Sequence, residues 1–127
     1  MLADTQQALA AIVGGAAAQD TPEGLPGVIT GDGAIPTTTS GATVLTKGSA
    51  AAITIALPTV AGVTRRIISD SAFAHVITFT GNGLRGGTAA VATATAAAQK
   101  GAGLTVVSLL PTEAAWGVVS NVAMTLA

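Results

Sequence analysis

The sequence predicts an all-β domain, a small β-sandwich or barrel of about seven short antiparallel strands, preceded by an extended N-terminal arm. Three observations predict it. Short runs rich in β-branched residues recur from residue 42 onward and are separated by glycine, proline or polar residues. Several of these runs alternate in side-chain character with a period of two. Before residue 42, glycine and proline interrupt every periodic run.

Residues 1–20 allow two interpretations. Asp4 followed by Gln7 fits a capping box at the start of a short helix, which Gly14–Gly15 would end. The apolar residues that would share one face of that helix are Leu2, Leu9, Ile12 and Val13. The alternative is an N-terminal tail without regular structure.

Residues 19–41 read as a linker, because proline and glycine recur throughout them. We therefore divide the chain into an arm and linker at 1–41 and a β domain at 42–127. Charge follows the same division. Four of the six acidic residues fall in the first 32 positions, whereas all five basic residues lie at or after Lys47. The arm is thus acidic and the β domain slightly basic.

Each strand of the β domain is predicted from its own pattern. The expected strands are Thr43–Thr46, Ala51–Leu57, Arg65–Ser69, His75–Thr80, Val91–Ala97, Leu104–Leu110 and Trp116–Leu126. Alternation places Ile53, Ile55 and Leu57 on one face of the second strand. It also places His75, Ile77 and Phe79 together. In the fifth strand threonine alternates with alanine, so a neighbouring strand can approach its small inner face closely.

Composition excludes several classes of function. The chain of 127 residues holds 28 alanines, 19 threonines and 16 glycines, but one histidine and no cysteine, and 9% of its residues are charged. The usual catalytic acids, bases and nucleophile partners are therefore scarce, and disulfides or cysteine zinc sites are excluded. Five basic against six acidic residues, with 2% aromatics, argue against nucleic-acid binding. We expect a structural protein without cofactor or metal.

A membrane span or a secretory leader is not expected either. The longest uncharged stretch, residues 48–64, contains Pro58 and is shorter than the about 20 apolar residues that span a bilayer. A secretory leader carries basic residues before its apolar segment. Here no basic residue precedes the first apolar stretch, and the acidic Asp4 precedes it instead. We therefore expect a protein made in the cytoplasm that has no membrane partner. A surface with so little charge favours assembly.

One motif offers a different function. Residues Gly81–Gly86 match the pattern G-x-G-x-x-G after a predicted strand, and the alanine-rich residues 88–100 are conceivable as the following helix. Such a loop lets the backbone approach a pyrophosphate at a helix N-terminus. Against this, Thr93 and Thr95 alternate with alanine, and the 41 residues after Gly86 are too few for the rest of a dinucleotide fold. A glycine-rich hairpin loop is the favoured interpretation, with nucleotide binding as a remote alternative.

Four further candidates have structural interpretations. His75 has no sequence cluster of ligands around it, and a catalytic arrangement with Ser71 or Ser69 is disfavoured by crowding. Arg65 and Arg66 are adjacent in a strand and so point to opposite faces. Trp116 is expected to anchor the core or an oligomer interface.

Five runs of the sequence together resemble small virion proteins of tailed bacteriophages, the capsid decoration (cement) and head-fibre proteins. These runs are Asp32–Ile35, Thr43–Ala52, Ala72–Thr78, Lys100–Val106 and Trp116–Ser120. Their order and spacing carry the resemblance, which covers residues 32 to 127. It implies an all-β protein that forms trimers or other small oligomers on the outside of the icosahedral head, with no catalytic motif.

The resemblance and the arm together give the expected function. We expect a homotrimeric decoration protein on the outer surface of the capsid, bound to the major capsid protein. The first 31 residues lie outside the resemblance, and we expect them to be the capsid anchor, through Leu2, Leu9, Ile12 and Val13, because an extended arm can order along a neighbouring subunit. Trp116 is the expected oligomer contact. The alternative is a head-fibre or tail-fibre component of the phage.

Overall fold

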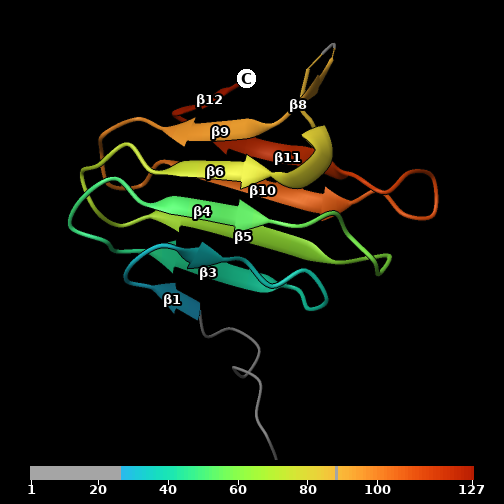
Figure 1. The fold of residues 1–127 in the computed structure, drawn as a ribbon, viewed down its shortest axis with the longest axis horizontal. Coiled ribbons are helices and arrows are strands. Elements are labelled where there is room, and N and C mark those ends of the chain that lie inside the picture. Colours follow the sequence, from blue (N-terminus) through green and yellow to red (C-terminus); the bar gives the residue numbers. More distant parts are fainter. Residues whose placement is uncertain (1–26, 88) are drawn as a thin grey trace, which may run out of the picture.

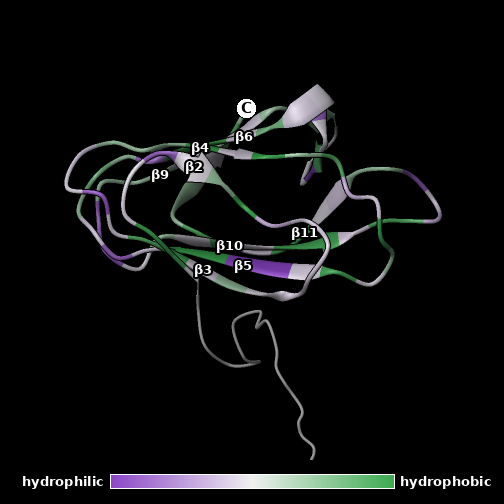
Figure 2. Cartoon of the chain, turned by 60° about the horizontal axis from the view of Figure 1, so that its bottom comes forward, coloured by the Kyte–Doolittle hydropathy of each residue, from purple (hydrophilic) through white to green (hydrophobic). Residues whose placement is uncertain are grey.

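The computed structural model describes residues 27–87 and 89–127. They form two β-sheets that pack face to face. One sheet has seven strands in the order β1-β3-β5-β10-β11-β7-β8, and the other has five in the order β12-β9-β6-β4-β2. Figure 2 shows the two sheets as separate layers. The all-β prediction and its sandwich form are therefore confirmed.

Twelve strands lie within the described residues. The seven-stranded sheet comprises β1 (Gly27–Ile29), β3 (Gly41–Leu45), β5 (Thr64–Ser69), β7 (Leu84–Arg85), β8 (Ala90–Val91), β10 (Gly103–Ser108) and β11 (Trp116–Val122). The five-stranded sheet comprises β2 (Gly33–Ala34), β4 (Ala52–Ile55), β6 (Val76–Phe79), β9 (Thr93–Ala96) and β12 (Met124–Leu126). A single 3₁₀ turn, η1 (Thr80–Asn82), follows β6.

The first six strands alternate between the two sheets. β1, β3 and β5 lie in the seven-stranded sheet, and β2, β4 and β6 lie in the other (Figure 1). The chain crosses to the opposite layer after each strand from β1 to β5. When it comes back to the first layer, the next strand there runs in the same direction as the previous one. The neighbours β1 and β3, β3 and β5, β2 and β4, and β4 and β6 are accordingly parallel.

The prediction of an antiparallel sheet is therefore wrong for this half of the fold. Antiparallel pairing joins β5 to β10, β10 to β11, β6 to β9, β9 to β12 and β7 to β8. The four parallel pairs among β1 to β6 arise because the connections after each of β1 to β5 cross to the other sheet instead of turning back within one sheet, and β7 and β11 form a fifth parallel pair. Antiparallel neighbours can be joined by a two-residue hairpin, whereas parallel ones need a longer crossover. Here that crossover contains a strand of the opposite sheet.

The strand count also differs from the prediction, because two of the expected strands change sheets midway. The expected strand at residues 91–97 divides into β8 and β9, which lie in different sheets. The expected strand at residues 116–126 divides into β11 and β12 at Ala123, whose φ of 56° turns the chain from one sheet to the other. The four remaining additional elements, β1, β2, β7 and η1, are each only two or three residues long.

The inner faces of the two sheets form one hydrophobic core. Its larger buried side chains are Leu45, Ile53, Ile55, Ile67, Ile77, Phe79, Leu84, Leu104, Val106 and Trp116. The predicted alternation is confirmed in β4 and β6, whose isoleucines and phenylalanine point inward. In β9 the inward residues are Ala94 and Ala96, both buried, so this strand contributes only small side chains to the core.

Part of the predicted linker belongs to the sandwich. β1 pairs with β3, and β2 pairs with β4, so residues 27–34 supply one edge strand to each sheet. Ile35, which follows β2, is buried in the core. The predicted capsid anchors Leu2, Leu9, Ile12 and Val13, and the helix capped by Asp4, lie outside the described residues.

Candidate functional site

His75 is the centre of a buried polar network at one end of the sandwich. It is fully buried, and its Nδ1 accepts a hydrogen bond from the Ala51 backbone N–H at 3.0 Å. Its Nε2 lies 2.7 Å from Ser71 Oγ. That hydroxyl donates to the Lys47 carbonyl at 2.9 Å. The network thus joins the loop between β3 and β4 to the loop between β5 and β6.

These contacts assign the protonation state of His75. Because Nδ1 accepts a backbone N–H, the proton of the neutral ring sits on Nε2 and is donated to Ser71. The structural interpretation of His75, a histidine whose ring is satisfied by hydrogen bonds, fits this geometry. His75 directly precedes β6. From the sequence, crowding disfavours a catalytic arrangement of His75 with Ser71, whereas the structure brings the two side chains into direct contact.

The same geometry differs from that of a hydrolytic triad. There, the histidine donates its Nδ1 proton to a carboxylate and takes the serine proton at Nε2. Here, Nδ1 is an acceptor and Nε2 already carries the proton, so His75 cannot act as the base for Ser71 in this tautomer. Asp32 is committed elsewhere, since its carboxylate accepts the Ala52 N–H and the Lys47 ammonium, both at 2.9 Å.

The His75 network predicts a loss of stability in mild acid. Burial, and secondarily the charge of Lys47, lower the pKa of His75 below its ordinary value of 6.5. The folded state then stays neutral while the unfolded state binds a proton, so the free energy of unfolding falls as the pH drops below about 6.5 and levels off below the folded-state pKa. Urea denaturation at pH 7.5 and 5.5 measures this. Equal free energies of unfolding at the two pH values would contradict the assignment of a neutral His75.

Arg65 is a second buried polar group, on the inner face of β5. It is 4% exposed, and its Nη1 donates to the Thr39 carbonyl while its Nη2 donates to Thr43 Oγ1, both at 2.8 Å. Within the described residues no hydrogen-bond partner faces its Nε. Burial lowers the pKa of the guanidinium. The contact with Thr39 holds the loop between β2 and β3 against β5.

Arg65 and Arg66 form a matched pair for mutation, because the adjacent side chains point to opposite faces of β5, as the sequence predicts. Arg65→Ala is expected to lower the free energy of unfolding by about 2 kcal/mol, since hydrogen bonds from a buried charged group are lost. Arg66→Ala, at the exposed position, is expected to change it by less than about 0.5 kcal/mol. Chemical denaturation of both variants checks this, and equal effects would contradict the buried placement of Arg65.

The glycine motif at Gly81–Gly86 begins in η1, after β6, and runs through β7. Gly81 lies in η1 with a φ of 66°. A Cβ on Gly83 would lie 2.6 Å from Leu57 Cδ2 and 2.9 Å from the Thr80 carbonyl, and one on Gly86 would lie 2.7 Å from both Leu126 and Val118. The helix that the nucleotide interpretation requires is replaced by β8 and β9. The glycines are therefore needed for close packing.

Gly83→Ala is expected to lower the free energy of unfolding by about 1–3 kcal/mol, because the added methyl group meets backbone as well as side-chain atoms. Gly87→Ala is the control, since nothing lies within 4 Å of its added Cβ. Thermal denaturation of the two variants compares them. If Gly83→Ala is as stable as Gly87→Ala, the close approach of Leu57 and Thr80 is wrong.

Trp116 lies in the core and not on the surface. Its side chain is fully buried, and the indole Nε1–H donates to the Ala56 carbonyl at 2.8 Å, which joins β11 to the chain just after β4. The expectation that it contacts a second copy is therefore wrong, because no part of the indole is exposed. Of its two predicted roles, the core anchor is the one observed.

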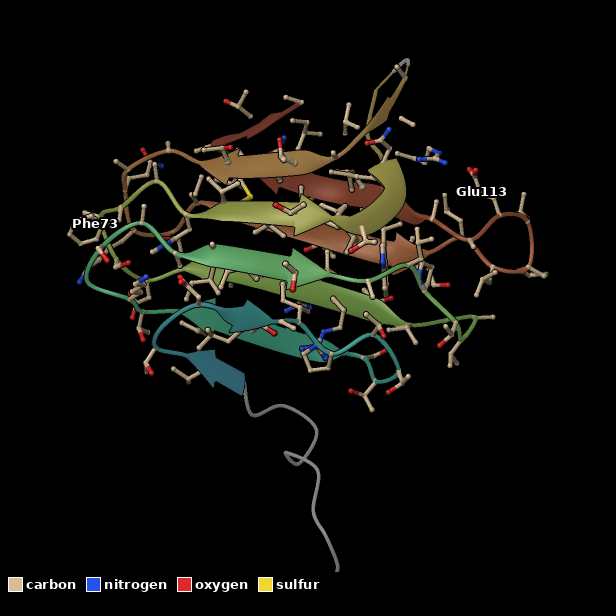
Figure 3. The ribbon with its side chains drawn as sticks, in the orientation of Figure 1. Phe73 and Glu113 are labelled. Atoms are coloured by element: carbon tan, nitrogen blue, oxygen red, sulfur yellow. The ribbon has the colours of Figure 1, made fainter. Side chains whose placement is uncertain are left out.

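Loops at the two ends of the sandwich carry exposed side chains. Phe73, in the loop between β5 and β6, and Glu113, in the loop between β10 and β11, lie at opposite ends (Figure 3). Phe73 is 40% exposed. Glu113 pairs with Arg85, with 3.4 Å between Oε2 and Nε. Because these side chains lie far apart, they do not form a common site.

The outer faces of the two sheets differ in chemistry. The outward side chains of β4, β6, β9 and β12 include five threonines, Thr54, Thr78, Thr93, Thr95 and Thr125. By contrast, the register of the seven-stranded sheet aligns five outward residues in one row across β1, β3, β5, β10 and β11. They are Val28, Val44, Ile68, Gly103 and Val122, which we call the apolar row. One sheet thus presents a hydroxyl-rich face to solvent, whereas the face of the other carries the apolar row beside a second row that includes Arg66, Thr105 and Ser120.

The apolar row is well exposed. Val28 is 57% exposed, Ile68 38% and Val122 56%, and Val119, at the irregular register between β10 and β11, is 63% exposed. Sequence reasoning could not find this row, because alignment of the five residues depends on the parallel register of β1, β3 and β5. Exposed apolar side chains gathered on one face are typical of interaction surfaces.

Within residues 27–87 and 89–127, no group of three or more histidine, aspartate or glutamate side chains is placed to hold a metal ion. No helix in the described part of the chain is long and apolar enough to cross a membrane. The described residues therefore define an all-β sandwich whose buried polar groups hold its loops together.

No protein-family model matches the chain, and no curated protein shows significant similarity to it.

Proposed function

We propose that this protein is a structural component of a tailed-bacteriophage virion, a decoration protein that binds the major capsid protein on the outer surface of the head as a small homo-oligomer, with a trimer as the expected form. The observation that carries the proposal is the resemblance of residues 32–127 to capsid decoration and head-fibre proteins. A protein of this kind needs no chemistry. It needs a rigid body and surfaces that bind its neighbours.

Two features of the sandwich support this role. The buried contacts of His75, Arg65 and Trp116 all join separate strands or loops, so the polar residues of the interior serve cohesion. The surface carries little charge and includes the exposed apolar row. Burial of such a surface costs little desolvation of charged groups and removes apolar area from water.

We assign capsid binding to residues 1–31, with Leu2, Leu9, Ile12 and Val13 as anchors. All four proposed anchors precede β1 in the sequence, and β1 is an edge strand of the seven-stranded sheet, so their replacement changes no residue of the core. Ordering of the segment on the capsid costs entropy, which several identical contacts in an oligomer offset through effective concentration.

Co-sedimentation with undecorated capsids of the same phage tests this assignment. Deletion of residues 2–20, or replacement of the four anchors by serine, is expected to weaken binding at least about tenfold. A matched control replaces Gln6 and Gln19, which lie outside the proposed cap and anchors, by alanine and is expected to bind as the full chain does. Unchanged binding of the deletion variant would refute the anchor role.

Labelling of the protein on intact virions tests the location. Label over the whole head in negative-stain images is the expected result. Label confined to the tail would refute decoration of the head and would favour the alternative of a tail-fibre component.

A further inference from the structure

The apolar row on the seven-stranded sheet has the features of a docking surface. Side chains of four strands contribute to it, and Gly103 leaves a shallow interval between Ile68 and Val122. The outer face of the five-stranded sheet, with its threonines, has no comparable apolar row among the described residues. Of the two outer sheet faces, the one on the seven-stranded sheet carries the exposed large apolar side chains Val28, Ile68, Val119 and Val122, and water contact with them is unfavourable.

Position and length point to residues 1–26 as the occupant. The chain enters the sandwich at β1, and Val28 of β1 is the first member of the apolar row. Fourteen positions separate Val13 from Gly27, and an extended chain of that length reaches about 45 Å. The row crosses five neighbouring strands, a span of about 19 Å. Ile12 and Val13 can therefore reach any point of the row in the same chain.

Charge points to the same segment. Residues 1–26 contain three acids, Asp4, Asp20 and Glu23, and no basic residue, whereas residues 27–127 contain five basic residues and three acids. On the outer face of the sheet, Arg66 is exposed in the row of residues next to Ile68, and no ion pair joins it to a described residue. Asp70 lies at the end of the same face, beyond Ile68. An acidic and apolar segment complements both the exposed Arg66 and the neighbouring apolar row.

We propose that residues 1–26 pack over the outer face of the seven-stranded sheet of the same chain, with Leu2, Leu9, Ile12 and Val13 on the apolar row. This packing is a property of the free protein and goes beyond the proposed function. If the protein also decorates capsids as proposed, the same four side chains contact the sheet in the free protein and the capsid in the assembled one. Binding to the capsid then includes their release from the sheet.

Thiol labelling in the absence of capsids tests the packing, because the chain contains no cysteine and a single introduced one reports cleanly. Ile68→Cys, and Val44→Cys as a second position, are labelled with Ellman's reagent in the full chain and in the chain lacking residues 2–20. The deletion is expected to accelerate labelling about tenfold, equivalent to about 1.4 kcal/mol of docking free energy. Thr78→Cys, on the threonine face, is the control and is expected to react equally in both.

Equal rates at Ile68→Cys and Val44→Cys in the two lengths would overturn the proposal. A second variant, Ile12→Cys with Ile68→Cys, is oxidised and run on a non-reducing gel. A disulfide within one chain is the expected product, and a disulfide between chains would overturn packing within the same chain. Because these experiments contain no capsids, a result that overturns the packing leaves the proposed capsid binding of residues 1–31 untested. That binding is tested separately by co-sedimentation.

Discussion

Trp116→Ala is expected to lower the free energy of unfolding by about 3–5 kcal/mol, the range for removal of a large buried aromatic side chain. Trp116 is fully buried among the core residues of both sheets, and its indole Nε1–H donates to the Ala56 carbonyl at 2.8 Å. The substitution removes both the packing and the hydrogen bond. Because small domains are stable by about 5–15 kcal/mol, this change alone brings the protein close to unfolding.

Trp116→Phe separates the two contributions. It keeps an aromatic ring in the core but removes the hydrogen bond to the Ala56 carbonyl and part of the packing, so a smaller loss of about 1–3 kcal/mol is expected. Urea denaturation followed by circular dichroism measures both variants against the full chain. A Trp116→Ala protein as stable as the parent would contradict the core position, and would return Trp116 to the surface role that the sequence first suggested.

His75→Ala is expected to have the second-largest effect, a loss of about 2–4 kcal/mol at pH 7.5. The substitution leaves a cavity and removes the acceptor of the buried Ala51 N–H and the donor to Ser71. It also removes the titrating group. The stability of His75→Ala should therefore no longer fall between pH 7.5 and 5.5, a range above the titration of ordinary carboxylates. Asp32 does not interfere, since hydrogen bonds from Ala52 and Lys47 lower its pKa.

Ser71→Ala is the matched control for this network. It removes the hydroxyl that accepts from His75 Nε2 and donates to the Lys47 carbonyl, but it keeps the ring and the Ala51 contact. A smaller loss of about 1–2 kcal/mol is expected, with the pH dependence retained. Chemical denaturation of the two variants at both pH values makes the comparison. If His75→Ala keeps the full pH dependence of the parent, then His75 is not its source.

The all-β class and most strand positions followed from the sequence because alternation is a local property. The isoleucines of β4 and the Ile77 and Phe79 side chains of β6 point inward as their spacing predicts. Strand direction is not local. Whether the residues after Leu45 return within one sheet or cross to the other depends on packing of the whole chain, so the parallel pairs were not predictable.

Contacts between distant residues were also beyond the sequence. Arg65 bonds to Thr39, and Trp116 bonds to Ala56, across 26 and 60 positions. The apolar row joins residues from Val28 to Val122, and no periodic pattern links them. By contrast, the opposite faces of Arg65 and Arg66 followed directly from strand geometry. Most predictions that needed one strand succeeded, although the expected strands at 91–97 and 116–126 each divide between the two sheets. Predictions that needed the register between strands did not succeed.

Light scattering of the free protein, followed by its mixing with undecorated capsids, tests the proposed function most directly. The expected results are a solution mass of a small oligomer, about three times the 12.1 kDa of one chain, and saturable binding to the outer surface of the capsids. A stable monomer of 12.1 kDa that leaves the capsids undecorated would contradict the proposed function.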